Sequence, residues 1–212
     1  MALRKIVEMG EDCLTKVCRP VTDFNQRLHT LLDDMTETLA EANGAGLAAP
    51  QVGILRRLCI VMDMDSEEYI ELVNPEIIAR SGEQTGLEGC LSVPGKWGLV
   101  TRPGYVRVRA QDRDGQWFEV EGEGLTARCF CHELEHLDGR LYTEHIDRFL
   151  TEEEVEELMN QEDDGCAFCS WERRKSPWPP SAGWWRTATK SAACSLSRIS
   201  PKTGGISWLS RL

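Results

Sequence analysis

An abrupt change of composition at Gly165 limits how much of this 212-residue chain can share one core. Five of the seven tryptophans lie beyond it, among Ser, Pro, Arg and Gly residues without any period: Trp171, Trp178, Trp184, Trp185 and Trp208. We therefore expect one domain over residues 1–164. We expect the tail over residues 165–212 to be disordered or an artefactual, frameshifted reading, which the intact mass of the native protein tests.

Charge is divided unevenly between these two parts. The tail carries eight of the 24 Lys and Arg residues and one of the 35 Asp and Glu residues. Residues 1–164, here called the body, therefore carry 16 basic and 34 acidic residues. A body this acidic repels a phosphate backbone, so we expect no direct DNA binding. The basic tail is the part that would touch the ribosome if any part does.

The compartment is suggested by what the sequence lacks. Its first residues contain no signal-peptide apolar run, and nowhere do about 18 uncharged apolar residues follow one another. We therefore expect a cytoplasmic protein with no membrane partner. Nine cysteines, an odd number without a secretory signal, are then expected to be thiols.

Three helices are predicted. Apolar residues recur at steps of three and four from Gln26 to Glu41, which indicates one buried helical face. A second helix is expected from about Gly124 to Leu137, because Asp138-Gly139 then provides a C-terminal stop. A third begins at Thr151, whose hydroxyl can cap the helix while Glu154 reaches back.

The middle of the chain is typical of antiparallel sheet. Short β-rich runs cover residues 58–63 and 69–78. We expect residues 105–111 to pair with residues 116–121 across the turn at 112–115, which contains Asp-Gly.

The second helix carries the motif that points to chemistry. His132 and His136 are four residues apart, so they project from one helical face and can share a metal ion. Glu133 lies beside them, where a carboxylate can accept the proton of an attacking water and later deliver it to a leaving group. The motif predicts metal-assisted hydrolysis.

Two histidines leave a catalytic metal one protein ligand short. His145 follows the Asp138-Gly139 break and lacks the glycine-centred spacing of longer zinc-protease motifs, so it is the less favoured candidate. Cys90, within Glu88-Gly89-Cys90-Leu91-Ser92, offers a thiol from a loop. Taken alone, this segment is a weak signal.

A third stretch, residues 44–51, reads G-A-G-L-A-A-P-Q, where small residues allow close backbone approach and Gln51 offers an amide. The motifs G-x-G-x-A-A-x-Q, E-G-C-L-S and H-E-x-x-H in this order closely resemble those of the peptide deformylases. The resemblance covers residues 1 to about 160, including an N-terminal strand, and excludes the tail. It implies an α+β fold of small antiparallel sheets around the helix with HExxH.

The resemblance also implies roles for individual residues. It implies that Cys90, His132 and His136 are the metal ligands and that Glu133 is the general acid and base. The Gln51 side chain and the Leu91 backbone N–H would donate hydrogen bonds to the oxyanion. The backbones of Gly46 and Gly89 would hold the substrate main chain.

Three further residues are candidates for a substrate side-chain pocket, because they share the helical face of His132: Leu125, Arg128 and Cys129. Ordinary helix packing explains these three equally well. The chain departs from the more usual family pattern at Cys131 and Glu135, where Gln and Asp are more frequent. Neither position is a ligand, so the departures leave the expected activity intact.

The implied reaction is removal of the formyl group from N-formylmethionyl peptides or nascent chains, which releases formate. The alternatives are an HExxH metallopeptidase with another third ligand and a non-catalytic, ribosome-associated metal-binding module. One divalent metal ion is expected. Cys and His ligands suit zinc and iron, with nickel and cobalt as further options, and the resemblance favours Fe(II).

Overall fold

The computed structural model describes residues 2–64 and 66–161. The expectations for residues 165–212 fall outside this part of the chain. Its helical elements are η1 (Asp12–Thr15), α1 (Gln26–Glu41), η2 (Ala49–Val52), α2 (Gly124–Leu137), η3 (Tyr142–Glu144) and α3 (Glu152–Gln161), where η marks a 3-10 helix. Its strands are β1 (Gly46–Ala48), β2 (Leu58–Met62), β3 (Tyr69–Ser81), β4 (Gln84–Cys90), β5 (Val93–Arg102), β6 (Tyr105–Gln111) and β7 (Trp117–Glu123).

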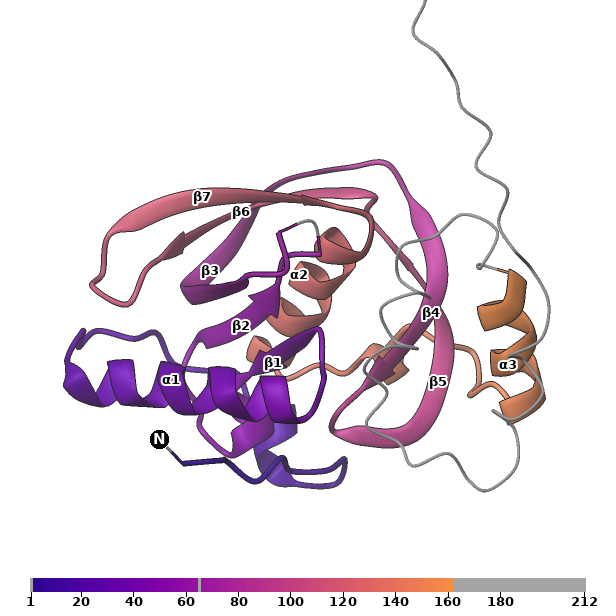
Figure 1. The fold of residues 1–212 in the computed structure, drawn as a ribbon, viewed down its shortest axis with the longest axis horizontal. Coiled ribbons are helices and arrows are strands. Elements are labelled where there is room, and N and C mark those ends of the chain that lie inside the picture. The colour runs from indigo at the N-terminus through magenta and orange to yellow at the C-terminus, as the bar shows by residue number, and fades with distance from the viewer. Residues whose placement is uncertain (1, 65, 162–212) are drawn as a thin grey trace, which may run out of the picture. The chain divides into compact units, whose positions relative to one another are not determined.

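The described strands form two antiparallel sheets. One has the order β1-β2-β3-β6-β7, and the other is the β4–β5 hairpin. Helix α2 lies between the larger sheet and the hairpin (Figure 1). Since the hairpin carries Cys90 and α2 carries both motif histidines, this packing brings the separate motifs of the sequence together.

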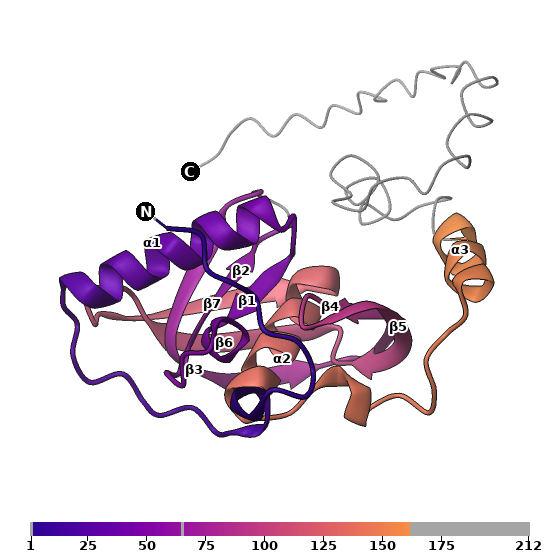
Figure 2. The ribbon, with the colours of Figure 1, turned by 90° about the horizontal axis from the view of Figure 1, so that it is seen from below.

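Strand β2 explains how the layers are held. All five of its residues are buried, because α1 covers one face of the sheet and α2 covers the other (Figure 2). Leu58 and Ile60 pack in the cluster with the apolar face of α1, whereas Cys59 and Val61 pack in the cluster with α2. A strand covered on both faces needs an apolar residue at every position, which is why its sequence is Leu-Cys-Ile-Val-Met.

The helix boundaries follow local signals. Asn25 caps α1 by accepting hydrogen bonds from the backbone N–H groups of Arg27 and Leu28. At α3, Thr151 and Glu154 exchange the two bonds of a capping box, at 3.3 and 2.8 Å. The expected ranges of α1 and α2 match the structure, and α3 begins one residue after Thr151.

One expectation about backbone conformation was wrong: the segment with Cys90 was expected to be a loop, but residues 88–90 are the end of β4. The small-residue stretch at residues 44–51, to which sequence analysis assigned no helix or strand, forms β1 and most of η2. In both, glycines sit in strands because another group occupies the place of a side chain.

Two global features complete the description of residues 2–64 and 66–161. None of the helices there is both long enough and apolar enough to cross a bilayer. The cysteines described are all free thiols, as expected from the sequence: Cys13, Cys18, Cys59, Cys90, Cys129 and Cys131.

Candidate active site

Cys90, His132 and His136 converge on one point between the hairpin and α2. One ligand atom from each lies within 4.8 Å of the others, and the Cys90 Sγ is 3.2 Å from His136 Nε2. Both histidines are buried, and their rings lie edge to face with centroids 4.9 Å apart. The ligand atoms of a tetrahedral site, with bonds of about 2.0–2.3 Å, lie roughly 3.5 Å from one another. The three side chains therefore fit around a single cation.

Protonation at this centre is compatible with metal binding. Burial and the neighbouring His132 hold the pKa of His136 well below its ordinary value, so its ring is neutral near pH 7. Burial also lowers the pKa of His132, but hydrogen bonds to Cys90 and Glu88 outweigh it and raise that pKa. A cation bound here competes with this proton, so binding is coupled to proton release.

The local backbone directs the Cys90 thiol toward α2. The pairing of β4 with β5 shifts register between Gly89 and Cys90, which turns the end of the strand. The backbone N–H of Ser92 then points back to the Cys90 Sγ at 3.4 Å. This contact holds the sulfur on the side of the turn that faces α2.

Gln51 also reaches this sulfur. Its Oε1 accepts a hydrogen bond from the Ala48 backbone N–H at 2.7 Å, so its amide nitrogen must face the opposite way. That nitrogen, Nε2, lies 3.5 Å from the Cys90 Sγ. Gln51 is almost fully buried, and its donor is therefore fixed beside the cluster of Cys90, His132 and His136.

Glu133 is a buried carboxylic acid next to the two histidines. It is 3% exposed, and its Oε2 has no hydrogen-bond partner among the described residues. Burial raises its pKa to about 7, although His132 opposes the shift and Glu88 adds to it. A carboxyl that titrates near neutrality can both take up and release a proton.

Gly46 leaves room for this carboxyl. A Cβ built on Gly46 would overlap the Glu133 Oε1 and lie 2.7 Å from the Glu133 Cγ and Cδ. We expect Gly46→Ala to displace Glu133 and lower kcat about a hundredfold, since small misplacements of a reacting group have effects of this size. Gly104→Ala is a matched control, because its new Cβ would be 3.8 Å from its nearest neighbour. Equal kcat values for the two variants would contradict this role of Gly46.

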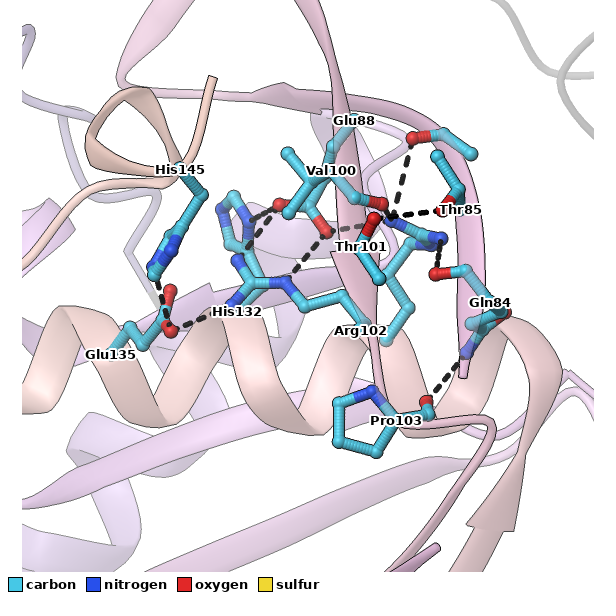
Figure 3. A network of polar contacts seen from close by, with 12 residues as sticks. Gln84, Thr85, Glu88, Val100, Thr101, Arg102, Pro103, His132, Glu135 and His145 are labelled. Atoms are coloured by element: carbon cyan, nitrogen blue, oxygen red, sulfur yellow. Dashed lines mark hydrogen bonds and ion pairs between the residues drawn. The ribbon is translucent and has the colours of Figure 1, made fainter. Parts of the chain in front are cut away.

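Glu88 holds His132 from behind. Its Oε2 is 3.3 Å from His132 Nδ1, and the Arg102 guanidinium binds the same carboxylate at 2.8 and 3.2 Å (Figure 3). The Arg128 guanidinium binds it as well, at 3.2 Å. Burial alone would raise the pKa of Glu88, but the hydrogen bonds from His132 and Arg102 hold it far below its ordinary value. Glu88 is therefore ionised and orients the ring so that Nε2 faces the ligand cluster.

The polar network continues from Arg102 to the surface. Arg102 pairs with Glu135 at 2.6 Å, and Glu135 accepts from His145 Nε2 at 2.9 Å (Figure 3). His145 thus binds Glu135 and lies outside the Cys-His-His group. Sequence analysis missed the part that Arg102 plays in this network. The available signal was its two-residue step from the buried Val100 on β5.

Tyr142 was also missed. Its ring stacks on His132 with centroids 5.9 Å apart, and its hydroxyl donates to the Lys96 carbonyl at 2.9 Å. η3 thereby fixes the other face of the imidazole. A lone Tyr after the helix gave no sequence signal for this contact.

The remaining predicted site residues occupy different surroundings. Cys129 is in the apolar cluster between α2 and the sheet, with half-buried Leu125 against it. Arg128 is buried, and its guanidinium binds Glu88 and the Val100 carbonyl, the latter at 3.0 Å. Gly89 lies under the Trp97 ring, which would meet a Cβ at 2.8 Å, and the Leu91 side chain packs beside Gly44. A substrate pocket formed by the helix residues stays a prediction.

Comparison with known proteins identifies the family. Residues 3–152 match the family model described as polypeptide deformylase. The chain belongs to this family. It is therefore an enzyme, a hydrolase that removes the N-formyl group from formylmethionine at the start of newly made proteins, as the resemblance implied. The metallopeptidase and non-catalytic alternatives are not favoured.

The sequences of individual relatives align with this chain over nearly their whole length. The chain is 58% identical over 147 residues to the peptide deformylase of Agathobacter rectalis, which covers 69% of this chain and 92% of the relative. It is 48% identical over 158 residues to peptide deformylase 1 of Bacillus subtilis, which covers 74% and 99%. Neither alignment covers all 212 residues of the chain.

Solved structures support the fold. The peptide deformylase of Legionella pneumophila superimposes with a TM-score of 0.66 at 40% identity, over 82% of this chain and 99% of that one. That of Thermotoga maritima gives 0.67 at 35%, over 70% and 100%. The expected α+β class is confirmed. The family is metal-dependent, which agrees with the Cys90, His132 and His136 cluster.

Proposed function

We propose that Cys90, His132 and His136 hold the single divalent metal ion of this deformylase and that Glu133 moves its protons. The observation that carries the proposal is the meeting of three distant motifs: the thiol, both imidazoles and the Gln51 amide lie around one point, with a buried carboxyl beside it. When bound, the metal ion supplies a Lewis acid and lowers the pKa of a water molecule to about 7.

The protein groups then supply the rest of the chemistry. Glu133 accepts the proton of the attacking water and returns it to the amine nitrogen as the C–N bond breaks, so that formate and a free N-terminus leave. Gln51 Nε2 and the Leu91 backbone N–H donate to the oxyanion that develops on the formyl oxygen. The backbones of Gly46 and Gly89 pair with the substrate main chain. Leu125, Arg128 and Cys129 border the methionine side chain.

We also propose that the reaction takes place in the cytoplasm, because its substrates are nascent chains. Contact with the ribosome stays a prediction.

Removal of the metal should abolish activity. We expect purified protein to release formate from formyl-Met-Ala-Ser. It should lose this activity in excess chelator, because the chelator competes with the protein for the metal ion. Re-addition of a divalent metal ion should restore it. Full activity of chelated, metal-free protein would contradict the proposed centre.

We propose Fe(II) as the native metal, since a thiolate and two imidazoles suit iron as well as zinc. A ferrous site with a thiolate ligand is sensitive to oxygen. Protein prepared without air should therefore be more active than protein prepared in air. Equal activities, with zinc, nickel or cobalt as the metal found by elemental analysis, would overturn the iron assignment.

A further inference from the structure

The N-terminal segment Arg4–Met9 crosses two parts of the active site without joining either sheet. The Val7 N–H donates to the Gln51 carbonyl at 2.8 Å, and the Met9 N–H donates to the Ser92 carbonyl at 2.7 Å. The resemblance implied a strand here, but no strand is assigned to these residues. The reason is that the two N–H groups bind two different elements, η2 and the turn of the β4–β5 hairpin, rather than one neighbouring strand.

Both contacted residues donate toward the same sulfur. Gln51 Nε2 is 3.5 Å and the Ser92 backbone N is 3.4 Å from the Cys90 Sγ. Gln51 belongs to η2, beside the larger sheet, whereas Ser92 lies in the turn of the β4–β5 hairpin. The segment therefore ties together, by their carbonyls, the two residues whose N–H groups converge on the metal-ligand thiol.

The segment is itself anchored on α1. The Arg4 guanidinium donates to the Asp34 carboxylate at 2.8 and 3.1 Å, and the Arg4 backbone N–H donates to the Thr38 hydroxyl at 2.9 Å. The Asp34 side chain is only 4% exposed, so this pair is poorly screened by solvent. The pKa of Asp34 is lowered by the Ala2 backbone N–H and by Arg4. Asp34 and Thr38, about one helical turn apart on the buried side of α1, thus fix where the segment begins.

We propose that residues 4–9 are a positioning strap that sets the separation between Gln51 and the Cys90–Ser92 turn, and that Arg4 and Asp34 hold the strap in place. The proposal rests on the proposed roles of Gln51, Leu91 and Cys90. N–H groups two residues apart in an extended chain face the same side, so residues 7 and 9 act as a fixed two-point spacer. In this proposal the strap acts on the site only through Gln51 and Ser92.

The turn after the strap allows the hydrogen bond between the Met9 N–H and the Ser92 carbonyl to be removed by one substitution. The Glu11 N–H donates to the Glu8 carbonyl at 3.2 Å, so Met9 and Gly10 are the central residues of a turn, and Gly10 has a φ of 113°. Proline is favoured at the first central position of turns with a positive φ at the second. Met9→Pro therefore keeps the turn and removes only the N–H that binds Ser92. Met9→Ala keeps this N–H, and the Met9 side chain is 46% exposed.

We expect Met9→Pro to lower kcat about tenfold with KM within about twofold of the parent, because the oxyanion donors are displaced while substrate contacts remain. Met9→Ala should match the parent. Independently of turnover, Met9→Pro should speed hydrogen exchange at the Ser92 amide and shift the thiolate-to-metal charge-transfer band of cobalt-loaded protein. Identical kcat, exchange and spectra in the two variants would overturn the strap.

The anchor is tested against a neighbouring ion pair of α1. Arg4→Ala should reproduce the Met9→Pro signature, and Arg4→Lys should restore most of kcat. Arg113→Ala is the control, since Arg113 pairs with Asp33 on the same helix at 2.9 Å but touches neither the strap nor the site. It should lower the unfolding midpoint and leave kcat and the cobalt spectrum unchanged.

Two outcomes separate the strap from the proposed function. A loss of kcat that follows the loss of stability equally in Arg4→Ala and Arg113→Ala would contradict the strap. A parent protein that releases no formate, but whose cobalt spectrum and Ser92 exchange still respond to Met9→Pro, would contradict the proposed function and leave the strap standing.

Discussion

Glu133→Gln should lower kcat for formate release about a thousandfold while leaving metal content and KM nearly unchanged. The amide has the size of the carboxyl and fills the same buried position, but it cannot accept a proton from water or return one to the leaving nitrogen. Steady-state kinetics with formyl-Met-Ala-Ser, together with elemental analysis of the same preparation, measures both quantities.

Glu123→Gln is the matched control. Glu123 precedes α2, is exposed and makes no side-chain capping bond, so the same chemical change there should leave kcat intact. A Glu133→Gln enzyme that retains a tenth or more of the parent kcat would show that another group moves the proton.

The pH profile gives a second measure of Glu133. Its pKa of about 7 is raised by burial, and a cation beside it lowers that value again. Activity should therefore fall as pH drops through the pKa, because the protonated carboxyl cannot accept the proton of water. The residual activity of Glu133→Gln should lack this acidic limb.

Cys90→Ala should lose the metal and with it at least about a thousandfold of the activity. Removal of a supporting residue already weakens metal affinity by about 10–100-fold, and loss of a ligand should exceed that range. Titration of metal-free protein with zinc, followed by calorimetry, gives the affinity, and formate release gives the activity. An HExxH metallopeptidase with a different third ligand would retain both.

Cys131→Ala controls for the loss of a buried thiol. Cys131 lies next to His132 on α2 but packs in the apolar cluster, and burial raises the pKa of its thiol. We expect this variant to bind metal like the parent. Metal affinity reduced equally in both cysteine variants would indicate a packing effect and would remove Cys90 from the proposed ligand set.

The sequence predicted the elements whose pattern is local. The range of α1 could be predicted because one of its faces is apolar at a period of 3.6 residues, and the range of α2 because Asp138-Gly139 stops the helix after Leu137. The strands β1, β4 and β5 were missed. Their glycines and polar residues are typical of loops, and only tertiary contacts, such as Trp97 over Gly89, explain why these segments extend.

Some residues of the candidate site could likewise be predicted from the sequence, and others could not. Adjacent motif letters predicted His132, His136 and Glu133, and the family resemblance added Cys90 and Gln51. The supporting network of Glu88, Arg102 and Glu135 joins residues 14 and more positions apart through burial, which a single sequence does not encode at any fixed spacing. The strap was missed for the same reason, because its contacts are made by backbone groups that every residue carries.

The position of α2 restricts how this enzyme can change over evolution. Eleven of its fourteen residues are buried, and they fill the core on one side while presenting His132 and His136, the proposed ligands, on the other. A substitution on this helix that changes the chemistry therefore also tends to lower the folding stability. The β4–β5 hairpin and the strap lie outside that core, so new substrate preferences can arise there at lower risk to the native state.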